Sequence, residues 1–136
     1  MPPGRRWRGG RGQEPRPRQI RSFIEPALLL LLRQGPSHGY ELIGGLAGVG
    51  LEEYPVDPST VYRALDLLEG AGMVTSARES GPSLGPPRRV YRITQAGEAY
   101  LDALVAELRL TDRVLHHFLE KYDEVSRPQR RPPSLG

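Results

Sequence analysis

The stretch DPSTVYRALDLLEGAG, residues 57–72, constrains the fold of this chain most sharply because it marks both ends of a single helix. Asp57 is a favourable N-cap residue, and Pro58 then occupies the first helical position, where its fixed φ suits a helix. Gly70 and Gly72 indicate the end of the same helix. Apolar residues recur with the i, i+3, i+4, i+7 spacing of a buried face, namely Val61, Ala64, Leu65 and Leu68.

Two segments before this helix also have helical patterns. Residues 22–36 are apolar on nearly all sides and rich in Leu, which predicts a buried first helix that Gly35 and Pro36 end. Residues 37–51 predict a short second helix that is capped by Ser37 and ends near Ala47. Its expected apolar face consists of Tyr40, Ile43, Leu46 and Ala47.

The segments after residue 72 have a different pattern. Residues 73–79 and 88–94 are typical of short strands, and the connection SGPSLGPP between them is rich in Pro and Gly. We therefore expect a β-hairpin with a long tip. Thr94 then caps a final helix that covers residues 95–122 or 95–125.

The order of these elements predicts a mainly α fold with a small β-hairpin. Residues 22–94 form a winged helix-turn-helix, in which the helix that starts at Asp57 is the recognition helix. Residues 95–125 form a long C-terminal dimerisation helix. Residues 1–21 and 126–136 are rich in Arg and Pro, and we expect them to be a disordered arm and tail.

The composition excludes several classes of function. The chain has 136 residues, enough for one compact domain, and no cysteine, which excludes disulfides and thiolate metal sites and suits a reducing cytoplasm. His38, His116 and His117 have no recognisable metal-ligand spacing, and no catalytic or cofactor-binding motif is present. We therefore expect no metal, no cofactor and no enzyme activity. The apolar run at residues 28–32 is too short to span a membrane.

The charge is unevenly distributed along the chain. The net charge is +3, but residues 1–21 hold seven Arg against Glu14 alone. Residues 22–125 hold nine basic and fifteen acidic side chains, a net charge of −6. Because the folded part is acidic, we expect the arginines of the arm and the wing to supply much of any affinity for DNA.

The outward groups of the recognition helix suit contact with DNA. They are Ser59, Thr60, Tyr62 and Arg63. An arginine can form two hydrogen bonds to guanine, and hydroxyls near a helix N-terminus can bond phosphate oxygens. Arg88 and Arg89, at the base of the hairpin tip, can contact phosphate or a minor groove. A solvated polar helix face and a charged strand edge that prevents aggregation explain the same patterns equally well.

The last predicted helix carries a heptad seam with spacings of three and four. Its members are Leu101, Leu104, Leu108, Thr111, Leu115, Phe118 and Tyr122. We expect the second half of the helix to pack against a second copy of the chain, which would set two recognition helices about 34 Å apart on a palindromic site. The alternative is that the helix folds back over its own domain.

Three motifs together resemble a known family: LLLLLRQGPSHGYEL at 28–42, DPSTVYRALDLLEGAGMV at 57–74 and RRVYRITQAGEAYL at 88–101. In this order they are similar to the PadR family of bacterial transcriptional regulators, in the compact type with a single C-terminal dimerisation helix. The resemblance implies a homodimer that represses transcription and leaves double-stranded DNA when an effector binds. The family's DNA contacts carry over to the recognition-helix and wing residues named above. His38 and Tyr40 match the HGYEL motif, either as DNA contacts or as groups that pack the second helix.

Two functions of different classes are therefore compared. The first is a cytoplasmic, sequence-specific, DNA-binding repressor that a small-molecule or polymer effector releases from a palindromic operator. The second is a dimeric winged-helix module that binds other proteins without specific DNA binding, which the acidic folded part favours.

Overall fold

The computed structural model describes residues 22–52, 56–79 and 87–128. It contains two compact units, one that ends at Leu101 and one that begins at Asp102. The predicted arm, the tip of the hairpin and the tail from residue 129 onward lie outside the described residues.

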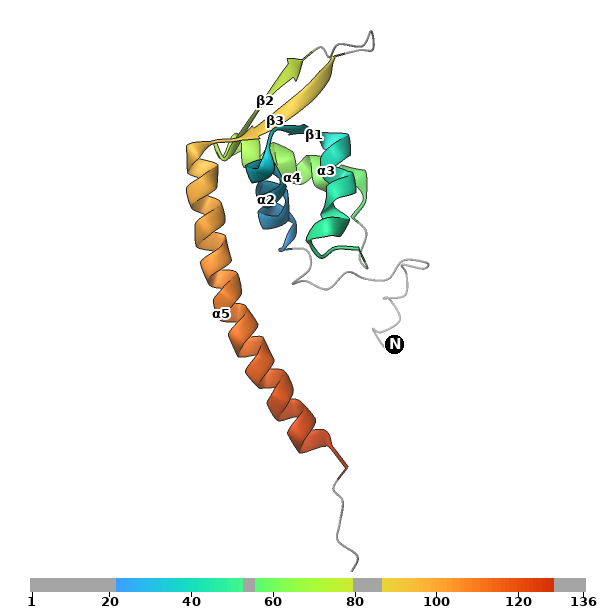
Figure 1. Cartoon of the computed structure of the whole chain (residues 1–136), viewed down its shortest axis with the longest axis vertical. Coiled ribbons are helices and arrows are strands. Elements are labelled where there is room, and N and C mark those ends of the chain that lie inside the picture. Colours follow the sequence, from blue (N-terminus) through green and yellow to red (C-terminus); the bar gives the residue numbers. More distant parts are fainter. Residues whose placement is uncertain (1–21, 53–55, 80–86, 129–136) are drawn as a thin grey trace, which may run out of the picture. The chain divides into compact units, whose positions relative to one another are not determined.

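The helical part of the first unit consists of α2 (Ile24–Gln34), α3 (Gly39–Gly45), the 3-10 helix η2 (Leu46–Val49) and α4 (Pro58–Gly70) (Figure 1). Their apolar faces enclose a core in which Leu28, Leu29, Val61 and Leu65 are fully buried. Burial of each such Leu stabilises the fold by about 1.5–3 kcal/mol. The mainly helical fold class and the first helix are thereby confirmed. On the predicted buried face of the recognition helix, Val61, Leu65 and Leu68 are buried and Ala64 is half-buried.

A three-stranded antiparallel sheet completes the first unit. Its strands are β1 (Ser37–His38), β2 (Val74–Glu79) and β3 (Arg88–Ile93), in the order β1-β3-β2. The hairpin of β2 and β3 extends beyond the helices (Figure 1). In the register, Tyr91 of β3 lies between Ser37 on one side and Ser76 on the other. The predicted hairpin is confirmed, and β1 is an element that the sequence did not predict.

The prediction that Ser37 caps the second helix is wrong. Ser37 pairs with β3 as part of β1, and α3 begins two residues later, after His38, whose side chain makes no capping hydrogen bond. The Ser37 hydroxyl instead donates to Glu41 Oε1 over 2.8 Å. Pairing with β3 satisfies backbone groups that a longer helix would have used, and the chain therefore stays extended through His38.

The predicted apolar face of the second helix is also partly wrong. Tyr40 is 78% exposed, and Ala47 is exposed, whereas Leu42 and Leu46 are buried. The later helix start and the tightening into η2 after Gly45 alter the periodicity, so the i, i+4 pair of leucines faces the core instead.

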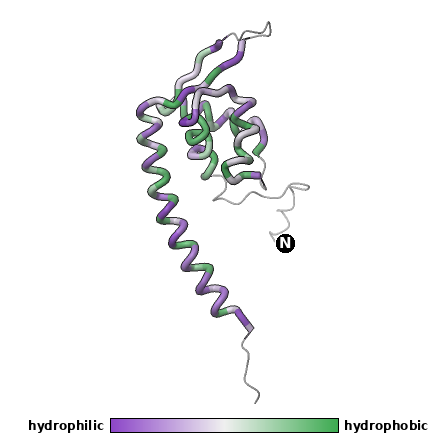
Figure 2. The backbone as a smooth tube through the Cα atoms, viewed as in Figure 1, coloured by the Kyte–Doolittle hydropathy of each residue, from purple (hydrophilic) through white to green (hydrophobic). Residues whose placement is uncertain are grey.

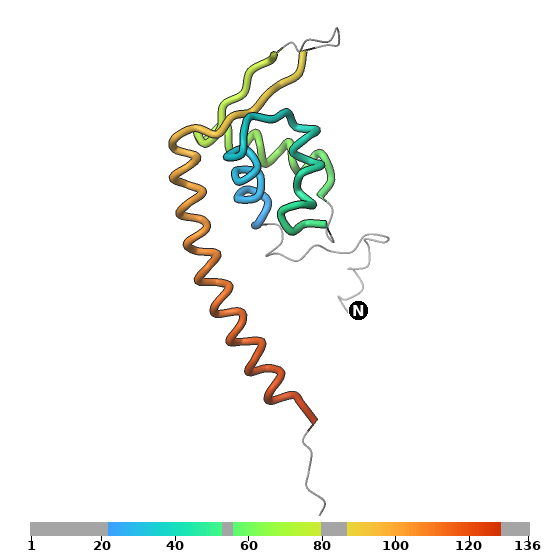
Figure 3. The backbone as a smooth tube through the Cα atoms, viewed as in Figure 1, coloured from blue at the N-terminus to red at the C-terminus, as the bar shows by residue number. Residues whose placement is uncertain are grey.

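The final helix, α5 (Gln95–Ser126), starts where the sequence predicts. The Thr94 hydroxyl accepts a hydrogen bond from the Gly97 N–H over 3.0 Å and donates to the Gly72 carbonyl over 2.8 Å. The strand β3 leads through this cap directly into α5 (Figure 3). None of the helices that the structure describes is long and apolar enough to cross a membrane.

The first turns of α5 belong to the core of the first unit. Arg33 Nε donates to Glu98 Oε1 over 2.6 Å, and the Tyr100 hydroxyl donates to Glu25 over 3.2 Å. Leu101, which the heptad pattern places on the dimer seam, is 1% exposed. Because it is buried within its own chain, we remove Leu101 from the predicted dimer surface.

Gly97 provides a test of how α5 joins the sheet. A Cβ at Gly97 would overlap the Met73 carbonyl oxygen and lie 2.8 Å from Ile93 Cγ1, so Gly97→Ala should reduce the free energy of unfolding by about 1–3 kcal/mol. The matched control is Gly44→Ala in α3, where nothing lies within 4 Å of the added Cβ and a gain of up to about 1 kcal/mol is expected. Urea unfolding at one protein concentration measures both. Equal stabilities of the two variants would contradict this packing.

Candidate nucleic-acid interface

The recognition helix α4 begins as the sequence predicts. Asp57 has an extended backbone, and its carboxylate accepts hydrogen bonds from the Thr60 N–H over 3.3 Å and from the Thr60 hydroxyl over 2.7 Å. Pro58 occupies the first helical position. After the helix, Gly72 has a φ of +83°, a left-handed conformation that favours glycine. Asp57 and Pro58 therefore fix the start of α4, and Gly72 lies just beyond its end.

The predicted DNA contacts on α4 differ in how accessible they are. Ser59 and Arg63 are exposed, Thr60 is half-buried, and Tyr62 is 41% exposed. Arg63 forms no hydrogen bond or ion pair with another residue in the described part of the chain. With respect to the described residues, its guanidinium therefore keeps all its donors available, whereas the Thr60 hydroxyl already donates to Asp57.

A hollow of about 500 Å³ lies at the junction of β1, the start of α3, α4 and β3. It is lined by His38, Gly39, Tyr40, Tyr62, Arg88, Arg89 and Tyr91. Five of these seven were predicted from the sequence to contact DNA: His38, Tyr40, Tyr62, Arg88 and Arg89. The fold thus brings together groups from segments 38–40, 62 and 88–89, while Ser59, Thr60 and Arg63 are not part of the lining.

Tyr62 and Gly39 are in direct contact at this hollow. A Cβ at Gly39 would overlap the ring of Tyr62, so only glycine leaves room for the ring in its observed position. Tyr40, the next residue, is 78% exposed. The interpretation of Tyr40 as a packing residue is therefore wrong for this structure, and its side chain is available at the surface.

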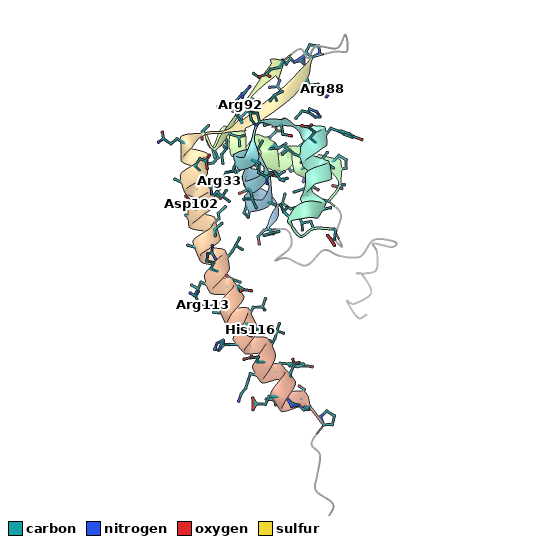
Figure 4. The ribbon with its side chains drawn as sticks, in the orientation of Figure 1. Arg33, Arg88, Arg92, Asp102, Arg113 and His116 are labelled. Carbon is teal, nitrogen blue, oxygen red and sulfur yellow. The ribbon has the colours of Figure 1, made fainter. Side chains whose placement is uncertain are left out.

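Arg88 is held by a histidine from the neighbouring strand. Arg88 Nη1 lies 2.9 Å from His38 Nε2. A guanidinium only donates hydrogen bonds, so in this contact His38 Nε2 is the acceptor. Glu41 lies 3.7 Å from the same nitrogen, and the hydrogen bond from Ser37 holds the pKa of Glu41 below its usual value. Arg88 and Arg92 both extend from β3 (Figure 4).

Arg89 is held from the other side by groups that the sequence analysis did not select. Arg89 Nη1 donates to Ser76 Oγ of β2 over 2.9 Å, and Ser76 Oγ lies 3.0 and 2.9 Å from the two oxygens of Glu69 on α4. Tyr91, beside Arg89 in the hollow, is 3% exposed, and burial raises the pKa of its phenol. Tyr91 therefore stays neutral at physiological pH and adds no negative charge to the hollow.

These features define the class of the protein. A capped helix with outward polar groups, followed by a hairpin that carries arginines, is the arrangement of a winged helix-turn-helix transcriptional regulator. Residues 28–103 match the family described as the transcriptional regulator PadR-like family, and the chain belongs to it. It is thus a DNA-binding regulator in a family of regulators rather than of enzymes.

Solved structures of transcriptional regulators support this assignment, and a further sequence is similar over most of its length. A transcriptional regulator from Clostridium thermocellum is 30% identical, with a TM-score of 0.68, and the match covers 77% of this chain and 98% of that one. A PadR family regulator from Eggerthella lenta is 29% identical, with a TM-score of 0.64, over 75% of this chain and 87% of its own. An uncharacterised protein of Lysinibacillus sphaericus is 28% identical over 74% of this chain and 92% of its own length.

The N-cap of α4 can be tested separately from DNA binding. Asp57→Ala removes the acceptor for two Thr60 groups and should lower the free energy of unfolding by about 1 kcal/mol, within a range of about 0.5–2 kcal/mol. Asp57→Ser is the control, because serine caps helices about as well as aspartate and should retain most of the stability. Urea unfolding measures the free energy of unfolding of both variants. If Asp57→Ser lost as much stability as Asp57→Ala, the side-chain cap would not be the cause.

Proposed function

We propose that this chain is a homodimeric repressor that binds a palindromic operator with two copies of α4 and two wings, and that an effector releases it. The observation that carries the DNA-binding part is the convergence of Tyr62 from α4 with Arg88 and Arg89 from β3 around one hollow. Family membership supports the regulatory role. Repression and release by an effector rest on the family resemblance.

The two parts of the interface would have different roles on DNA. Arg63 is exposed and unpaired within the described residues, so it is the residue best able to form two hydrogen bonds to a guanine edge. Ser59, which is exposed near the start of α4, would bond a phosphate close by. Arg88 and Arg89 are anchored to neighbouring groups and would contact the phosphate backbone, which positions the protein without reading sequence.

The second unit supports the homodimer. On α5, seven large apolar side chains are between 48% and 69% exposed: Leu110, Val114, Leu115, Phe118, Leu119, Tyr122 and Val125. At 100° per residue they lie on one side of the helix, and apolar and polar residues alternate along it (Figure 2). The predicted seam residues Leu115, Phe118 and Tyr122 are members of this stripe, while Leu104 and Leu108 are half-buried. A second copy of α5 is the partner that a heptad seam implies.

Arg63→Ala tests sequence reading by α4. Loss of a two-bond contact to guanine should weaken binding to the DNA upstream of the chain's own gene by about 10- to 100-fold, with a smaller loss on a mixed-sequence duplex. Arg63→Lys keeps the charge without the planar fork and should recover only part of the affinity. Fluorescence anisotropy with both duplexes measures these differences.

Two outcomes would contradict the proposal. An equal loss of affinity on both duplexes would show that Arg63 contacts phosphate rather than a base. If the wild-type protein is dimeric and binds neither duplex at low salt, the protein-interaction module becomes the better explanation.

A DNA-binding dimer that neutralises about six to ten phosphates should lose roughly 10³- to 10⁵-fold in affinity between about 50 and 200 mM salt.

Phe118→Glu tests the dimer. Phe118 is 63% exposed at the centre of the apolar stripe, and a carboxylate buried there between two copies would be strongly unfavourable, so the variant should be monomeric. Arg113→Glu introduces the same side chain on the opposite side of α5 and should remain dimeric; Arg113 is labelled in Figure 4. Sedimentation equilibrium gives the mass of each variant. A monomeric wild type, or a dimeric Phe118→Glu, would contradict the proposed interface.

A further inference from the structure

Three elements of the first unit meet in a chain of hydrogen bonds that ends at a wing arginine. Glu69 lies near the end of α4, Ser76 is in the middle of β2, and Arg89 is the second residue of β3. Arg89 and Tyr91 lie on the same face of β3, and Ser76 pairs directly with Tyr91, so Ser76 and Arg89 are diagonal neighbours. The distance from Arg89 Nη1 to Ser76 Oγ is 2.9 Å.

The chemistry of the three side chains fixes the direction of every hydrogen bond. Arg89 can only donate, and the ionised carboxylate of Glu69 can only accept. The single proton of the Ser76 hydroxyl must therefore point to Glu69, whose two oxygens lie 3.0 and 2.9 Å away. The lone pairs of Ser76 Oγ then face Arg89. Because no other arrangement of protons satisfies these contacts, Glu69 orients the hydroxyl that holds the arginine.

The strand register also places a like charge opposite Arg89. Arg78 of β2 lies directly opposite Arg89 of β3, and like charges in that position repel each other. The negative charge of Glu69, presented through Ser76, offsets this repulsion on the same face. Ser76 also stands between Arg89 and Glu69, so that it accepts from the guanidinium where a direct ion pair with the carboxylate could otherwise form. Among the described residues, this contact uses one of the five N–H donors of Arg89 and leaves most of the others available.

We propose that Ser76, oriented by Glu69, is a positioning residue that sets Arg89 for contact with a DNA phosphate; this rests on the proposed DNA-binding function. A guanidinium that is already ordered loses less side-chain freedom on binding than a free one. The wing arginine is thereby tied to the recognition helix itself, since Glu69 belongs to α4. Arg89 would therefore keep a fixed position relative to α4, the helix proposed to read the bases.

The experiment measures the affinity of the full chain for a fluorescein-labelled, mixed-sequence DNA duplex at low salt, where phosphate contacts dominate. Arg89→Ala should weaken binding. Ser76→Ala should weaken it by about three- to tenfold, because the arginine must now be ordered on binding. Ser76→Thr keeps the hydroxyl, suits a strand, and should restore the affinity of the wild type. In the Arg89→Ala background, Ser76→Ala should cause no further loss.

Each contrary result has a distinct meaning. If Ser76→Ala weakens binding as much in the Arg89→Ala background as in the wild type, Ser76 does not act through Arg89 and the inference fails. It also fails if Ser76→Ala binds like the wild type, or if Arg89→Ala does. If the wild-type protein binds no DNA, the proposed function itself fails. Thermal unfolding of each variant confirms that the compared proteins are folded, and the threonine variant provides the comparison if Ser76→Ala is unstable.

Discussion

The pairing of β3 with both β1 and β2 is the constraint on which the rest of the interface depends. Without β1, the segment before α3 would not be tied to the wing, and His38 would not lie 2.9 Å from Arg88. Without β2, Ser76 would not reach Arg89. A hairpin of two strands alone is marginally stable in water, and here the central strand is braced on both edges. The same strand leads through Thr94 into α5, so one element connects the helices, the wing and the final helix.

The acidic character of the folded part looks unfavourable for DNA binding, but the structure shows where several of the carboxylates are directed. Asp57 accepts hydrogen bonds from Thr60, Glu41 accepts one from Ser37, and Glu69 accepts one from Ser76. These carboxylates are held by groups of their own chain close to the predicted contacts. They still carry charge, but they shape the interface by capping α4 and orienting Ser76. Part of the negative charge therefore serves to order groups that we propose to contact DNA.

How well the sequence predicted each part depended on whether the signal was local. The Asp57 cap, the Thr94 cap and most of the buried face of α4 follow from residues within one or two turns of each other, and all three are confirmed. The strand β1 was missed because Ser37 and His38 are a pair of residues whose partner strand lies some fifty positions away. The second helix was misassigned for the same reason, since its start depends on that pairing. Local patterns cannot report a contact that only the folded chain creates.

The residues of the candidate site also differ in whether local sequence patterns can identify them. Arg63 and Ser59 could be selected from helical spacing alone, because outward positions on a capped helix follow from geometry. The roles of Ser76, Glu69 and Gly39 could not, because each acts through a residue on another element. Gly39 matters only because the ring of Tyr62 packs against it, and Glu69 only because Ser76 lies beside it. Candidate DNA contacts can thus be proposed from sequence, whereas residues that position them need the fold, and Glu69 of α4 belongs to the second group.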